Sequence, residues 1–137
     1  MEPKKRMFVM PAEFYGGMEE RKVNENVITQ VFTDAGLDVS LKRISLSRLQ
    51  AEQIIPLKRN NPMYEHEVSS LSQDGKIACL ITLQGDNVDD VVRRYLPVGL
   101  DKFKRREFLS KSAKLAEFYG NGNSMYPRFL DASNMDC

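Results

Sequence analysis

The sequence is poor in the residues from which catalytic and metal sites are most often built: it has one histidine, two cysteines and no tryptophan. One histidine and two distant cysteines cannot form a tetrahedral metal site. A second histidine and any local signature of a Ser/His/Asp or Cys/His nucleophile are also missing. We therefore expect no metal ion, no cofactor and no hydrolase of these classes.

The sequence also lacks an excess of charge of one sign and any long apolar run. Its formal net charge is +1, so no global field draws the protein toward nucleic acid or an anionic membrane. No run is long enough to span a bilayer, and the apolar stretch 7–11 is too short for the core of a signal peptide. We expect neither nucleic acid nor a membrane as a partner.

The two cysteines are Cys79, in an apolar run, and Cys137, at the last position. Their number and positions do not match the disulfide pattern of a small secreted domain. A reducing, cytoplasmic compartment is the expectation, and it includes the ciliary and cytoskeletal spaces. With 137 residues, 42% of them hydrophobic and 28% charged, the chain has the size and composition of one globular domain.

Apolar periodicity predicts alternating strands and helices. The run Ile77–Leu83 has no polar alternation, which indicates a strand buried on both faces. From Val27 to Ala35 apolar residues recur at helical spacing, with Asn24 as the N-cap and Gly36 as the stop. The other expected elements are a strand at 7–11, a loop at 13–21, a strand at 37–46 with a bulge or a change of exposed face near Lys42 and Arg43, helices at 48–57 (capped by Ser47), 63–71 and 88–96 (capped by Asn87), and a strand at 114–119.

The order of these elements contains the split βαβ unit of a ferredoxin-like sheet. We expect an α/β domain of the α+β type, with a four-stranded antiparallel sheet and helices packed on its face. The domain covers residues 1–124, and an irregular C-terminal tail covers 125–137. The core residues expected from the pattern are Phe8, Val31, Phe32, Val39, Leu80, Ile81, Val92 and Leu115.

Several segments resemble those of nucleoside diphosphate kinases, in the same order and at similar spacing. The similarity covers roughly residues 5–124. The first strand with its proline resembles the family's V-K-P-D strand end, and the segment at 117–124 resembles its active-site signature I-H-G-S-D-S. The matching segments are FVMPAEF, NENVITQVFTDAGLDVSLKRISLS, LQAEQIIPLKRNNPMY, GKIACLITLQGDNVDDVVRRYLPVG, KRREF and EFYGNGNS.

The family transfers a phosphoryl group through a phosphorylated histidine, and the resemblance places Tyr119 at that position. A phenol with a pKa near 10 stays protonated at neutral pH and has no ring nitrogen to accept the group. The single histidine, His66, falls in the expected helix 63–71, so no shift of the alignment restores the nucleophile. The resemblance therefore implies that the nucleophile is missing.

Other positions of the family's site are altered as well. The lysine position holds Met10, which offers no charge to the phosphate oxygens. The tyrosine position holds Ile54, the asparagine position holds Ala116, and the aromatic residue that stacks on the base corresponds to Met63 or a neighbour. Two arginines are kept, and they are expected to be the only residual phosphate contacts. These are Arg93 and Arg105.

The resemblance thus implies a pseudoenzyme without bound nucleotide, acting as a structural or docking subunit of a larger assembly. Divergent members of this family occur as domains of ciliary and axonemal proteins, which suggests a ciliary, axonemal or microtubule-associated assembly. The alternative is a phosphotransferase with altered catalytic residues, or one that keeps residual nucleotide binding. The loop after Gly99 is shorter than the family's, and no last amphipathic helix follows Ser124, so the usual hexamer is not expected.

The tail from Ser124 carries more apolar side chains than a solvated terminus usually keeps. One interpretation is that it orders on a partner protein, with Tyr126 and Phe129 as interface anchors. The other is that the tail folds back onto its own sheet. The sequence leaves both open.

Overall fold

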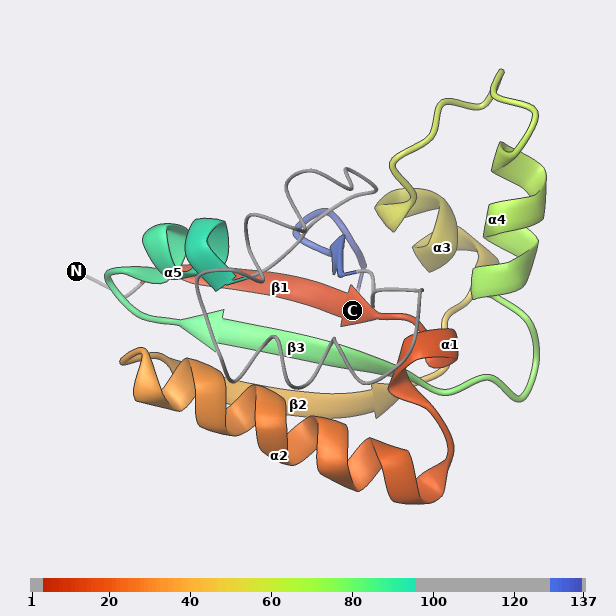
Figure 1. The fold of residues 1–137 in the computed structure, drawn as a ribbon. Helices are drawn as coiled ribbons and strands as arrows, with labels where there is room; N and C mark the ends of the chain where they lie inside the picture. Colours follow the sequence, from red (N-terminus) through yellow and green to blue (C-terminus); the bar gives the residue numbers. More distant parts are fainter. Residues whose placement is uncertain (1–3, 96–128, 137) are drawn as a thin grey trace.

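The structure is a computed structural model that describes residues 4–95 and 129–136. The described residues form one four-stranded sheet in the order β2-β3-β1-β4, and each neighbouring pair is antiparallel (Figure 1). This confirms the predicted ferredoxin-like sheet with packed helices. The elements in chain order are β1 (Lys5–Met10), α1 (Ala12–Tyr15), α2 (Met18–Asp34), β2 (Asp38–Ile44), α3 (Arg48–Ile54), α4 (Tyr64–Leu71), β3 (Ala78–Gln84), α5 (Val88–Tyr95) and β4 (Leu130–Asp131).

Strand β3 lies between β2 and β1, at the centre of the sheet. This confirms the prediction that the continuous apolar run forms a strand covered on both faces. The strand predicted at 114–119 lies outside the described residues. The strand that pairs with the other edge of β1 is β4, which belongs to the tail for which the sequence pattern predicts no regular structure.

Alternation along the strands divides the apolar side chains between two cores. The main core lies on the face covered by α2 and α5, and it contains Phe8 and Met10 of β1 together with Ile81 of β3. The second core lies on the opposite face and contains Val9 and Leu80. Of the core residues expected from the sequence, Leu115 lies outside the described residues and Val39 is half-buried, while the buried ones are Phe8, Val31, Phe32, Leu80, Ile81 and Val92.

Helix α2 begins earlier than predicted, at Met18. The segment 13–21, expected to be a loop, holds the end of α1 and the first turn of α2. Gly17 is the residue before the helix, and Glu19 and Glu20 in the first turn suit the positive end of the helix dipole. The predicted N-cap, Asn24, instead lies within α2, where its side-chain amide donates a 2.9 Å hydrogen bond to the carbonyl oxygen of Tyr15.

Helix α2 ends at Asp34, and the predicted stop residue, Gly36, follows it with a φ of 91°. The Gly36 N–H donates to the Thr33 carbonyl and the Leu37 N–H donates to the Phe32 carbonyl, both at 3.0 Å. This is the Schellman arrangement, in which a left-handed glycine closes the helix. Leu37 and Phe32 both pack in the main core, so the chain enters β2 at a fixed angle.

Strand β2 has no bulge. It pairs with β3 without interruption from Asp38, opposite Gln84, to Ile44, opposite Ala78. The slip in the apolar pattern is a change of face: Leu41 packs against the main core and Ile44 against the second core. Between them, Arg43 takes the position on the α2 side that a further apolar residue would have filled.

Helices α3 and α4 pack on each other beside the end of the sheet (Figure 1). Ser47 caps α3 as predicted: its side chain accepts from the Gln50 N–H, and the Gln50 side chain accepts from the Ser47 N–H. The helix ends at Ile54 and not near residue 57, because Pro56 follows and the residue before a proline disfavours helical geometry. A small hairpin core of Ala51, Tyr64 and Val68 holds the two helices together.

Candidate functional site

Met10, which the resemblance places at the position of the family's lysine, is the last residue of β1 and is fully buried. It lies opposite Cys79 of β3 and packs in the main core, in the same cluster as Phe8 and Tyr15. The backbone at this position directs its side chain into an apolar interior. The methionine therefore fills core volume.

Ile54, which the resemblance places at the position of the family's tyrosine, is the last residue of α3 and is 5% exposed. It packs in the second core with Leu46 and Leu80. Met10 and Ile54 thus lie in separate cores on opposite faces of the sheet.

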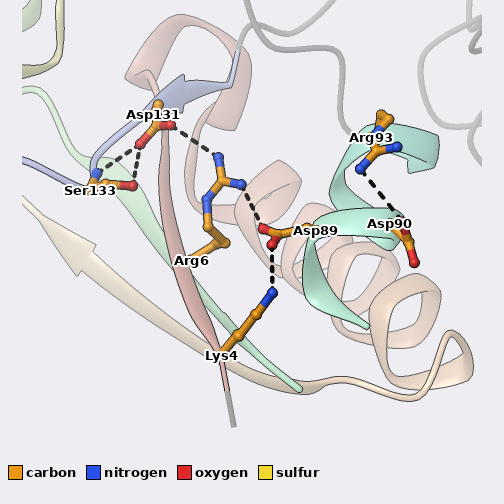
Figure 2. A network of polar contacts seen from close by, with 7 residues as sticks. All are labelled: Lys4, Arg6, Asp89, Asp90, Arg93, Asp131 and Ser133. Carbon is orange, nitrogen blue, oxygen red and sulfur yellow. Dashed lines mark hydrogen bonds and ion pairs between the residues drawn. The ribbon is translucent and has the colours of Figure 1, made fainter. Parts of the chain in front are cut away.

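Arg93, one of the two arginines expected to contact phosphate, lies on α5 with its side chain 79% exposed. It forms an ion pair with Asp90 across one turn of the helix at 3.6 Å (Figure 2). Exposed pairs of this kind contribute little to stability. Four predicted positions lie outside the described residues, namely Arg105, Ala116, Tyr119 and Tyr126.

Phe129, expected as an anchor on a partner protein, is fully buried in the main core of its own chain. Residues 129–136 fold back along β1: β4 pairs with it, and the Ala132 N–H donates to the Met7 carbonyl at 2.9 Å. Of the two interpretations that the sequence leaves open for the tail, the burial of Phe129 favours folding back onto its own sheet for residues 129–136.

A polar cluster that sequence reasoning missed lies beside Met10. Arg43 of β2 donates through Nε to the Tyr15 hydroxyl at 3.2 Å, and its terminal nitrogen pairs with the Glu25 carboxylate at 2.7 Å. Burial raises the pKa of Tyr15 to about 12 and the pKa of the Cys79 thiol to about 11. Both groups stay protonated at neutral pH, so neither is an activated nucleophile.

These two raised pKa values predict a loss of stability in alkali. In the unfolded chain the groups release their protons at lower pH, so their contribution is complete below about pH 9 and is lost as pH rises through about 11 and 12. We expect the urea midpoint to fall between pH 8 and pH 11, and to fall less in Tyr15→Phe. Equal midpoints for the native chain at the two pH values would contradict the burial of both groups.

A second polar network ties β1 to α5 and β4 (Figure 2). The Arg6 guanidinium pairs with Asp89 at 3.0 Å and with Asp131 at 3.1 Å, and Lys4 also reaches Asp89 at 3.4 Å. The hydrogen bond from Arg6 lowers the pKa of Asp89. Burial alone would raise the pKa of Asp131, but hydrogen bonds from Ser133 and the charge of Arg6 outweigh it and lower the value. The network holds three elements together at the rim of the sheet.

A cavity of about 200 Å³ lies between the α3–α4 pair and β4. Met63, which the resemblance places at or near the family's base-stacking position, lines this cavity and is 51% exposed. Asn61 and Glu67 are the polar residues of the wall. The apolar residues are Ile55, Pro56, Leu57, Met63, Leu71 and Leu130.

Residues 4–95 and 129–136 were also compared with the requirements of a metal site, a membrane-spanning helix and a catalytic histidine. No group of three metal-ligating side chains gathers in this part of the chain. None of its helices is long and apolar enough to cross a membrane. His66 is exposed on α4, away from the sheet strands.

No protein-family model matches the sequence, and a comparison with curated proteins finds no match. Solved structures do match. The nucleoside diphosphate kinase of Aquifex aeolicus superposes with a TM-score of 0.61 and 16% identity, over 93% of this chain and 84% of that one. An NDP kinase from Pyrobaculum aerophilum matches with a TM-score of 0.50 and 16% identity, over 97% of this chain and 86% of that one. The chain therefore has a nucleoside diphosphate kinase-like fold.

Proposed function

We propose that this chain is a non-catalytic module that uses a nucleoside diphosphate kinase-like fold as a structural or docking subunit of a larger protein assembly. The observation that carries the proposal is the burial of Met10 at the lysine position. A phosphate site needs charge or hydrogen-bond donors that face a cleft. Here the corresponding side chain is apolar and sealed in the main core.

The other altered positions support the same proposal. Ile54 packs in a different core and has no hydroxyl group to orient a phosphate. Tyr119 stands where the nucleophile is expected, and its phenol has no ring nitrogen to accept a phosphoryl group. A fold that has lost its chemistry remains useful when its surface binds something. The assembly we propose is cytoplasmic and of the ciliary, axonemal or microtubule-associated kind.

The alternative is a phosphotransferase with altered catalytic residues, or a residual nucleotide-binding protein. The exposed guanidinium of Arg93 favours it, because an exposed arginine is able to meet a phosphate oxygen. Binding by arginine alone is not catalysis, since charge stabilisation has to act together with a nucleophile.

Turnover of a labelled nucleoside triphosphate with a nucleoside diphosphate acceptor separates the two functions. We expect no transfer above the rate of a sample without protein, and no gain in Tyr119→His, because the lysine, tyrosine and asparagine positions remain altered. Transfer that grows with protein concentration and is lost in Arg93→Ala would favour the phosphotransferase. The docking role itself is tested by whether the chain elutes from native extract in a complex larger than its own 15.7 kDa.

A further inference from the structure

The α3–α4 pair has a hairpin core of its own. It joins the sheet through the second core, in which Ile54 of α3 is buried and against which Leu71 of α4 packs. The ion pair between Arg48 and Glu65, at 2.6 Å, adds a polar link between the two helices. Residues 45–47 and 72–77 join the pair to the sheet, and Figure 1 shows both helices beside the sheet and not across its face.

The segment 129–136 contacts α3 through Asp136. The Asp136 N–H donates to Gln53 Oε1 at 2.9 Å, and Gln53 Nε2 donates to the Asp136 carboxylate at 3.0 Å. Gln50 Nε2 donates to the Asp136 carbonyl oxygen at 2.8 Å. Three hydrogen bonds therefore meet at one residue, and all three involve glutamines on α3.

The same segment is fixed to the sheet at its other end. Strand β4 pairs with β1, and Asp131 forms an ion pair with Arg6 at 3.1 Å. Ala132 and Met135 are buried in the second core, which Ile54 of α3 also enters. Residues 129–136 thus bridge the sheet and the helix pair.

The apolar cavity lies at this joint. One wall comes from the helix pair, through Ile55, Leu57 and Leu71, and Leu130 of the segment 129–136 supplies another. The cavity interrupts the packing at this joint, while Ile54 of α3 is buried in the second core. Apolar contact and the exposed hydrogen bonds of Asp136 therefore hold the joint closed together.

We infer that residues 129–136 are a latch that holds the α3–α4 pair against the sheet, and that releasing Asp136 from Gln50 and Gln53 lets the pair open at the cavity while the sheet stays folded. Opening exposes the apolar walls of the cavity, including Leu57 and Leu71. The inference concerns the fold itself and does not depend on the proposed docking function.

Native-state hydrogen exchange of the full chain carrying Gln53→Ala tests the latch. The variant removes two of the three hydrogen bonds, one of them to a carboxylate, and alanine favours α3 itself. We expect amides of residues 48–71 to exchange about tenfold faster, because losing two such hydrogen bonds raises the equilibrium constant for local opening by about that factor. Amides of β3 should keep their rates.

Gln30→Ala is the matched control, since Gln30 is an exposed glutamine that bonds within α2 to Asp34. It should leave exchange in residues 48–71 unchanged. Unchanged exchange of residues 48–71 in Gln53→Ala would overturn the latch. An equal acceleration in β3 would overturn it as well, because it would make the Asp136 contacts part of global stability.

Discussion

Replacing Met10 by lysine should destabilise the protein strongly and should not create phosphotransfer. Met10 is 0% exposed in the main core, so the new ammonium group would be buried without a designed partner. We expect a loss on the order of 3 kcal/mol in the free energy of unfolding at neutral pH. Urea unfolding followed by circular dichroism measures it.

Two further measurements make this prediction specific. Met10→Leu conserves volume and polarity and should cost less than about 1.5 kcal/mol. Burial lowers the pKa of an introduced lysine, so the unfolded chain binds more protons and the stability of Met10→Lys should rise from pH 7 to pH 9. A Met10→Lys protein as stable as the native chain would mean that this position opens to solvent, as a catalytic lysine requires.

Phe129→Ala should be similarly damaging. The ring is fully buried in the main core although it comes from the C-terminal tail, and removal of a buried phenylalanine typically costs about 3–5 kcal/mol. The thermal midpoint of the isolated chain should fall accordingly. Ser133→Ala is a control in the same segment, because Ser133 is exposed and its hydroxyl donates to the Asp131 carboxylate at the surface.

The tail's two interpretations give opposite results for Phe129→Ala. A ring that anchors a partner would leave the isolated domain as stable as before and would reduce co-purification instead. Burial of Phe129 within its own chain instead predicts that Phe129→Ala lowers the thermal midpoint of the isolated domain. A native midpoint for isolated Phe129→Ala would contradict the packing described above.

The sequence was sufficient to predict the elements whose signals are local. The central strand follows from an uninterrupted apolar run, the start of α3 from Ser47 and Gln50, and the end of α2 from Gly36. Each depends on residues close together in the chain, where backbone geometry and capping chemistry decide the outcome. The resemblance added the overall fold, which the solved nucleoside diphosphate kinases confirm.

Other features depend on contacts between distant residues, which periodicity does not report. Strand β4 has two residues, too few for any alternation to be seen, and its place is decided by pairing with β1. The cluster of Tyr15, Glu25 and Arg43 joins α1, α2 and β2. Its only trace in the sequence is the interruption of the apolar pattern at Arg43, which is equally typical of a bulge.

The candidate site could be predicted only in part. The resemblance alone implies that Met10 and Ile54 replace the family's lysine and tyrosine. Their burial in separate cores could not, because which core a side chain enters depends on sheet register and helix packing. Burial of Met10 supports the proposal, because a side chain that binds phosphate has to face a cleft and not the core.

The most direct test of the central claim is the mass of the protein itself after incubation with ATP and Mg²⁺, measured intact without acid treatment. A ping-pong phosphotransferase accumulates a covalent phosphoenzyme when no acceptor is present. We predict an unchanged mass for the native chain, with a catalytically active nucleoside diphosphate kinase as the positive control. An added phosphoryl group, acid-labile and mapped to a residue near Tyr119, would contradict the proposal that this fold has lost its chemistry.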